Sequence, residues 1–411
     1  MKKILAICWL TAMFSSTTAL ACTTVIISGK YTADGRPILW KNRDTGNPNN
    51  KIVYLKDGKF RAIALIDSDD AKSNNIWIGF NNAGFAIMNT ASYNLKGSDS
   101  TKLVDQEGVL MKAALLSCSS VDDFEKFLAD YKKPRGVEAN FGVIDASGGA
   151  AWFETNNFSY TKIDVNDKRI APHGYIVRTN YSFTGAPNDG SGYIRYETAE
   201  KLFYRASGSK NLNVPYMLEN ICLSLENSYS KQKLEDFLNL NEREENFIYF
   251  QDCINRYTSS SSVIIHGVKP EEPAEFTTMW ARVGFPLSTL PVPLWITPKG
   301  SLPAIVKADA KENAEICDLS LKLKNIMVPS QRAETKYYIN TTAIYNAQGS
   351  GITQKLLPLT REIIKNTEEK LSLWRKNKKL NQAEVESFYG WIDNYVRKGY
   401  SELFNIRVSE K

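Results

Sequence analysis

The sequence predicts a layered α+β fold, because its strand patterns and helix patterns come in blocks rather than in alternation. Residues 23–104 are rich in β-branched runs and turn signals, a helical block follows, strands resume near 139, and helical patterns dominate after 308. A regular alternation of strands and helices would instead favour a parallel sheet with crossover helices. Hydrophobic residues make up 43% of the 411 residues and aromatic residues 11%, which is ample for a folded core.

The first block begins with a predicted hairpin. The β-branched run 23–28 predicts a strand, the segment Ala33-Asp34-Gly35-Arg36-Pro37 is a turn signal, and a second strand is expected to start at Ile38. The same patterns continue along this block. Further strands are expected at 52–55, 60–66, 75–80 and 85–90.

The helices of the second block have recognisable spacing and caps. Apolar residues predict a helix over 106–116, and Ser120 with Asp123 predicts the capped start of a helix over 121–131. The segments that follow are interpreted by the same criteria. Strands are expected at 139–145, 150–155, 159–163, 174–179, 261–266, 275–283 and 292–296, and helices at 193–206, 214–226 and 232–238.

The C-terminal part of the sequence changes character after the proline-rich stretch 286–303. Periodic apolar residues predict that it is helical and packs on the main domain. The chain is therefore divided into a leader at 1–21, a main domain at 22–300 and a helical region at 308–411. Helices in this last region are expected at 309–325, 335–348, 355–378 and 381–404.

Residues 1–21 have the pattern of a secretory signal peptide. Two lysines are followed by a mostly apolar run over 4–14, and Ala19-Leu20-Ala21 matches a cleavage site. Cleavage after Ala21 would make Cys22 the first residue. Its α-amine, with a pKa of about 8, would then be a general base beside a thiol with a pKa of about 8.5. We therefore expect an exported, periplasmic or extracellular protein with a nucleophile at its mature terminus.

Two other interpretations of Cys22 remain open. Bacterial lipoproteins also begin with cysteine, although Ala19 stands where their processing usually has a large aliphatic residue. Cys22 would otherwise be half of a disulfide. Removal of the leader with Cys8 leaves five cysteines, and their spacing does not reveal a pairing.

Composition argues against several classes of function. The net charge is +6, with both signs mixed along the chain, so no basic patch for nucleic acid stands out. His173 and His266 are the only histidines, and no cysteine pair has metal-ligand spacing. After the leader, no apolar run is long enough to cross a bilayer. We expect neither a metal nor an organic cofactor.

The residues near the predicted terminus resemble a known family. Cys22-Thr23-Thr24, a hairpin and Lys41-Asn42-Arg43-Asp44 are similar to the cysteine branch of the N-terminal nucleophile hydrolases. This branch contains conjugated bile acid hydrolases, penicillin V acylases and isopenicillin N acyltransferase-like proteins. The resemblance implies a four-layer αββα sandwich with the nucleophile at the start of a central strand. It also implies that Asp44 holds the α-amine of Cys22. Lys41 occupies the family's arginine position, and Arg43 is the other basic side chain that could reach the site.

Three downstream residues extend the resemblance. Asn89 matches the asparagine that helps to form the oxyanion hole. Asn180, at the end of Tyr175-Ile176-Val177-Arg178-Thr179-Asn180, matches a second asparagine at the substrate or oxyanion side. Arg256 matches a late arginine of the family. A preorganised amide donor at an oxyanion lowers the barrier by roughly 3–4 kcal/mol.

Together these features predict an exported cysteine amidase that acts on linear amides through an acyl-thioester on Cys22. The expected partner is a small N-acyl amide, and both hydrolysis and acyl transfer occur among the relatives, which are often oligomers. The alternative is a lipid-anchored surface or binding protein that has the same fold without the chemistry.

Overall fold

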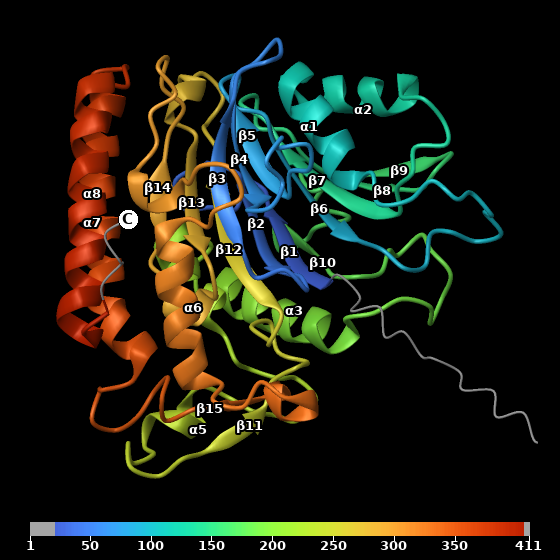
Figure 1. Cartoon of the computed structure of the whole chain (residues 1–411). Coiled ribbons are helices and arrows are strands. Elements are labelled where there is room, and N and C mark those ends of the chain that lie inside the picture. Colours follow the sequence, from blue (N-terminus) through green and yellow to red (C-terminus); the bar gives the residue numbers. More distant parts are fainter. Residues whose placement is uncertain (1–20, 407–411) are drawn as a thin grey trace, which may run out of the picture.

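Two antiparallel sheets stacked face to face form the centre of the protein, in a computed structural model that describes residues 21–406 (Figure 1). The first sheet has the strand order β10-β1-β2-β12-β13-β14, and the second follows chain order from β3 to β9. The first comprises β1 (Ala21–Ile27), β2 (Ile38–Asp44), β10 (Tyr175–Arg178), β12 (Ser259–His266), β13 (Thr278–Val283) and β14 (Val292–Leu294). The second comprises β3 (Asn50–Leu55), β4 (Ala62–Asp67), β5 (Ile78–Asn81), β6 (Ala86–Ala91), β7 (Ala139–Ile144), β8 (Ala150–Thr155) and β9 (Tyr160–Asp164).

Helices cover the outer faces of both sheets. The helix α1 (Glu107–Ser117) contacts β5 and β6, and α2 (Val121–Asp130) follows it, whereas α3 (Tyr193–Gly208) contacts β1 and β10. The chain therefore has the αββα arrangement that the resemblance implies, with C-terminal helices added to it (Figure 1). These are α6 (Glu315–Met327), α7 (Ile352–Lys376) and α8 (Gln382–Phe404).

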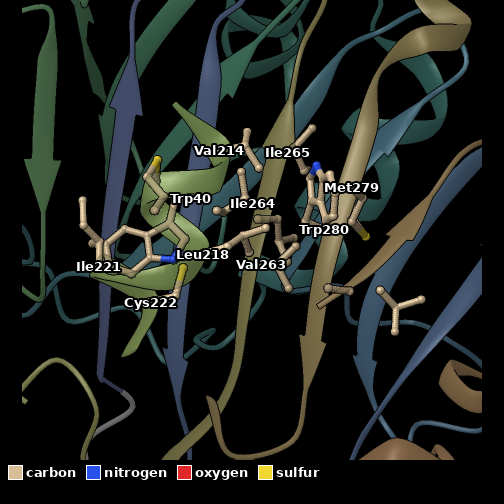
Figure 2. Packing of buried hydrophobic residues seen from close by; sticks show 14 of the residues in the cluster. Trp40, Val214, Leu218, Ile221, Cys222, Val263, Ile264, Ile265, Met279 and Trp280 are labelled. Carbon is tan, nitrogen blue, oxygen red and sulfur yellow. The ribbon is translucent and has the colours of Figure 1, made fainter. Parts of the chain in front are cut away.

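The largest apolar core surrounds the six-stranded sheet. The indole of Trp40 in β2 is fully buried and donates to the Ser262 hydroxyl at 2.9 Å. Figure 2 shows it beside Leu218, Ile221 and Cys222, which come from α4 (Val214–Glu219) and the 3-10 helix that follows. A second core lies between the seven-stranded sheet and α1 and α2. Burial on both faces explains why these strands appear in the sequence as nearly continuous apolar runs.

The predicted hairpin is confirmed and fixes the position of the first described residues. The turn between β1 and β2 contains Gly35 at a φ of +76°, a backbone conformation that residues other than glycine rarely adopt. Asp34 closes the turn, since its carboxylate accepts from the Arg36 amide at 3.2 Å. The register places Cys22 opposite Arg43 and Ala21 opposite Asp44. The start of β1 therefore meets the end of β2.

The predicted helix over 335–348 is wrong. The structure has a 3-10 helix at Ala333–Tyr337, a short strand β15 (Tyr338–Asn340) paired with β11 (Phe247–Tyr249), and turns beyond. Side-chain amides account for the difference. Asn340 accepts from the amide and hydroxyl of Thr342, at 3.2 and 2.7 Å, which offers the backbone an alternative to a helix.

The other helix predictions are confirmed with shifted bounds or shortened. The Ser120 hydroxyl accepts from the Asp123 amide at 3.0 Å, as the capping pattern predicts. The segment 214–226 is helical only as α4 and a 3-10 turn at Ile221–Leu223, and 232–238 only as α5 (Glu235–Leu238). Within residues 21–406, no helix combines the length and the apolar character that a membrane crossing requires.

Candidate active site

Cys22 stands at the start of β1, which lies between β10 and β2 in the six-stranded sheet. Residues directly opposite in antiparallel strands share a face, and so do residues two positions apart along one strand. Cys22, Lys41 and Arg43 therefore point to one face of the sheet, and Asp44 belongs to the other. Lys41 bonds to Asn89 of β6, so the face of Cys22 is the one turned toward the seven-stranded sheet.

A cavity of about 590 Å³ opens at Cys22. The volume suits a small organic molecule. Its wall combines cations near Cys22, the aromatic residues Trp77 and Tyr93, apolar residues and carboxylates. Burial raises the pKa of one of these carboxyl groups, Glu107, to about 7. The lining includes Cys22, Lys41, Arg43, Asp44, Trp77, Asn89, Tyr93, Leu103, Val104, Glu107 and Glu138.

The backbone of Cys22 is held by two buried side chains. Its nitrogen donates to Oδ1 of Asn180 at 3.0 Å, and its carbonyl oxygen accepts from Nη1 of Arg195 at 2.6 Å. Arg195 also donates through Nη2 to Oδ1 of Asn180 at 2.7 Å. The amide nitrogen Nδ2 of Asn180 donates to the Ala91 carbonyl at 2.9 Å. In this arrangement Asn180 therefore acts on the nitrogen of Cys22.

Arg195 is a site residue that the sequence analysis missed. It is 2% exposed and comes from the first turn of α3, which packs on β1. A cation in the first turn of a helix is opposed by the helix dipole. The first turn of α3 has no acidic residue. An arginine in the first turn of a predicted helix is therefore the sequence feature that could have identified this residue. It indicates that a specific partner compensates for the repulsion between the cation and the helix dipole.

Asp44 is buried, and one of its two oxygens accepts no hydrogen bond within the described part of the chain. Its Oδ1 accepts from the Ser259 hydroxyl at 2.6 Å, and Oδ2 lies 3.4 Å from Nε of Arg256. No described residue donates a hydrogen bond to Oδ2. Burial raises the pKa of Asp44, while Arg256, Arg195 and the Ser259 hydroxyl act in the opposite direction. Asp44 is paired in the sheet with Ala21, the residue before Cys22, and its Oδ2 has acceptor capacity that no described donor uses.

Lys41 fixes the orientation of the Asn89 side chain. Its Nζ donates to both the carbonyl oxygen and Oδ1 of Asn89 at 2.7 Å, and to the Trp77 carbonyl at 3.1 Å. An ammonium group only donates, so the oxygen of the Asn89 amide must face Lys41. The Nδ2 group is then left as the donor. Burial lowers the pKa of Lys41 to about 8, and interaction with Cys22 opposes this shift.

Arg43 has other partners, although it lines the same cavity. Its guanidinium binds both oxygens of Asp67, at 2.8 and 3.1 Å, and Oδ1 of Asn50 at 2.7 Å. It also lies 4.4 Å from the centre of the Trp77 ring. Of the two basic candidates, Lys41 is the one that interacts with both Cys22 and Asn89.

The structure brings all six predicted site residues together. Cys22, Lys41, Asp44 and Asn89 line the cavity, Asn180 holds the Cys22 nitrogen, and Arg256 pairs with Asp44. The two histidines are elsewhere, His266 beside Asp34 and His173 against Tyr204.

The remaining cysteines and the side chains of metal-ligating type complete the description of residues 21–406. The five cysteines among residues 21–406 are free thiols, and Cys8 of the predicted leader falls outside the described residues. No group of three His, Cys, Asp or Glu side chains suited to a metal occurs in that part of the chain.

Comparison with known sequences finds a remote relative. No family model matches the chain. It is 23% identical over 257 residues to a probable dipeptidase from Salmonella dublin, which is 54% of this chain and 58% of the relative. The chain thus spans a little over half the length of this relative.

Comparison with solved structures gives amidases and acylases at low similarity. A Caenorhabditis elegans N-acylethanolamine-hydrolyzing acid amidase ortholog has a TM-score of 0.35 at 14% identity, over 47% of this chain and 87% of that protein. A variant of conjugated bile acid hydrolase from Clostridium perfringens has a TM-score of 0.38 at 12% identity, over 68% and 94%. Penicillin V acylase from Agrobacterium tumefaciens has a TM-score of 0.34 at 12% identity, over 68% and 86%. These solved proteins belong to the N-terminal nucleophile hydrolases, the family that the sequence resembles.

Proposed function

We propose that the protein is an exported hydrolase of linear amides, with Cys22 as its nucleophile after removal of residues 1–21. One observation carries the proposal. The nitrogen of Cys22 donates to Oδ1 of Asn180, and the residue before it, Ala21, is paired in the sheet with Asp44, a buried carboxylate whose Oδ2 accepts no hydrogen bond from the described residues. A peptide nitrogen has one hydrogen to donate, whereas a terminal amine has two or three. The site therefore suits a free α-amine better than a peptide bond.

The proposed reaction has two steps with the same base. The α-amine of Cys22 takes the thiol proton as Sγ bonds to the substrate carbonyl carbon, and it returns the proton to the leaving nitrogen as the C–N bond breaks. Water then attacks the thioester carbonyl carbon and loses a proton to the same amine. The C–S bond breaks, the acid is released, and the amine returns the proton to Sγ. Asn180 and Asp44 orient the amine, and Arg195 holds the carbonyl of Cys22 in place.

Asn89 is the proposed donor to the oxyanion. Its Nδ2 is directed away from Lys41, and Asn89 lines the cavity with Cys22. A preorganised side-chain amide donor contributes about 3–4 kcal/mol to stabilisation of a tetrahedral intermediate. Lys41 is a positioning residue in this account, because it acts through the Asn89 amide.

The proposed substrate is a small compound with an open-chain amide bond. The cavity of about 590 Å³ has apolar and charged walls, which suits an N-acyl compound with a polar group. The similar proteins include a probable dipeptidase, a conjugated bile acid hydrolase and a penicillin V acylase, which are hydrolases and acylases of amide bonds.

Trapping of the acyl-enzyme tests the proposal. The mature protein is mixed with a panel of N-acyl arylamides, quenched in acid during the first turnover, and digested for mass spectrometry. We expect the acyl mass on the peptide that begins with Cys22, and its loss on treatment with neutral hydroxylamine, which cleaves thioesters. An adduct on another residue, or the same adduct in Cys22→Ala, would rule the mechanism out.

The pH dependence of activity is expected to follow the titration of the Lys41 ammonium group. The ammonium form donates to Asn89, and since burial lowers its pKa to about 8, that form disappears as the pH rises through about 8. Activity should therefore fall on the alkaline side. Lys41→Arg keeps a cation above pH 9, because a guanidinium stays protonated there, and should move the alkaline limb upward.

A neutral variant completes this test. Lys41→Met is expected to lower kcat by roughly 100-fold below about pH 8, because Asn89 loses its orientation, and the difference from the wild type should narrow at higher pH. Steady-state kinetics between pH 6 and 10 measure both variants. An alkaline limb that stays in place in Lys41→Arg would assign it to another group.

A further inference from the structure

We infer that the C-terminal helix α6 has a positioning function at the proposed active site, and that Lys324 exerts it on the turn 254–259, which holds Asp44. The inference rests on the proposed function for its kinetic consequence. Its structural basis is independent of the substrate. Lys324 lies on α6, far along the chain from Cys22, and its hydrogen bond and ring contacts are with Tyr257 and Phe285, which do not line the cavity.

The turn 254–259 supplies partners to both oxygens of Asp44. Ser259 donates its hydroxyl to Oδ1 at 2.6 Å, and Arg256 places Nε 3.4 Å from Oδ2. Thr258 accepts from the Thr45 amide at 2.9 Å, directly after Asp44. The position of this turn therefore determines the orientation of the Asp44 carboxylate.

Local hydrogen bonds make the turn one unit. The Ser259 amide donates to the Arg256 carbonyl at 2.9 Å, and the Arg256 amide donates to the Ser259 hydroxyl at 3.0 Å. The guanidinium of Arg256 also donates to the Thr258 hydroxyl at 3.0 Å. A displacement of Tyr257, which lies between these residues, would move Arg256 and Ser259 with it.

Lys324 anchors the turn at Tyr257. Its Nζ donates to the Tyr257 carbonyl at 2.6 Å and lies 4.4 Å from the centre of the Tyr257 ring. The ring of Phe285 is 5.0 Å away on another segment. The ammonium group of Lys324 thus contacts two aromatic rings and one carbonyl oxygen, and its positive charge strengthens all three contacts. We therefore expect it to hold Tyr257 in a fixed position.

The burial of Lys324 indicates that its contacts matter to the protein. The residue is 6% exposed, and no carboxylate of residues 21–406 lies within ion-pair distance of its Nζ. A buried cation without a counter-ion costs free energy. In agreement, burial lowers the pKa of Lys324 to about 8, opposed by Cys317 and Asp44. An apolar residue at this position would not lose hydration free energy in this way. The hydrogen bond and ring contact with Tyr257 are therefore the interactions that offset the desolvation of Lys324.

Lys324→Met removes the anchor, and Ser320→Ala is the matched control. Ser320 is also buried on α6, but its hydroxyl bonds to the Phe285 carbonyl at 3.1 Å and to Ser288 rather than to the turn. Both variants should lose some thermal stability. We expect only Lys324→Met to lower kcat/KM, by tenfold or more, with little change in KM.

A double variant separates positioning from a general loss of stability. If Lys324 acts through Asp44, Lys324→Met should cause no further loss of kcat in an Asp44→Asn background. A merely structural role would multiply the two losses. Multiplied losses, or equal kinetics for Lys324→Met and Ser320→Ala, would overturn the inference.

A measurement without substrate keeps the inference testable if the proposed function fails. The rate of Cys22 alkylation by iodoacetamide is followed against pH on the N-terminal peptide. Displacement of Asp44 removes a negative charge from the neighbourhood of the α-amine, so the reactivity profile in Lys324→Met should move to lower pH by half a unit or more. The profile of Ser320→Ala should match the wild type. Identical profiles in all three proteins would contradict the positioning role whatever the substrate is.

Discussion

Cys22→Ala is expected to abolish amide hydrolysis, with a loss of kcat/KM of at least about 1,000-fold, because no other group of the site can form the thioester. The fold should persist. Cys22 is a small residue at the start of a strand, and its backbone contacts with Asn180 and Arg195 do not involve the thiol. We expect the far-UV circular dichroism and the unfolding temperature to stay close to those of the wild type.

The matched control for this prediction is Cys118→Ala. Cys118 is a buried free thiol at the end of α1, outside the cavity lining. Burial raises the pKa of its thiol to about 11, which makes it a poor nucleophile at neutral pH. Turnover should stay within a few-fold of wild type in this variant. Full activity in Cys22→Ala would show that the nucleophile is a different residue.

Asp44→Asn is expected to lower kcat by roughly 100-fold or more, because the amine loses the charged acceptor that orients it and supports its protonated form. The change in stability should be small by comparison. Burial raises the pKa of Asp44, so its ionised form is held at a cost that a neutral amide avoids, while Arg256 loses its counter-charge. These two effects oppose each other.

The control for Asp44→Asn is Asp67→Asn. Asp67 also pairs with an arginine of the cavity wall, Arg43, at 2.8 Å, but it does not contact Cys22 or Asp44. Steady-state kinetics and thermal unfolding are measured for both variants. A loss of kcat in Asp44→Asn that is absent from Asp67→Asn would show that the charge acts at the amine and not merely near the cavity. Equal rates for Asp44→Asn and the wild type would assign Asp44 a purely structural role.

Much of the architecture could be predicted from local patterns. The β-branched run at 23–28 and the turn around Gly35 gave the hairpin, whose register then brings Cys22 within reach of Lys41 and Asp44. The capping pattern at Ser120 gave α2. These features depend on neighbouring residues only. The segment 335–348 failed because side chains such as Asn340 compete with helical hydrogen bonds, which periodicity does not reveal.

The complete site could not be derived from spacing, because its contacts join distant segments. Arg195 meets Cys22 across 173 positions, and Ser259 meets Asp44 across 215. Neither has a local motif. The resemblance supplied the candidates Asn89, Asn180 and Arg256, whereas the hydrogen bonds that distinguish their orientations come from packing of the two sheets.

The most direct test is the identity and chemistry of the first residue of the mature protein. Expression of the full chain in an exporting host, purification of the released protein, intact-mass measurement and stepwise N-terminal degradation should find a chain that begins with Cys22 with a free α-amine and a free thiol. A diacylglycerol adduct on Cys22, a blocked amine, or cleavage at any other bond would contradict the account.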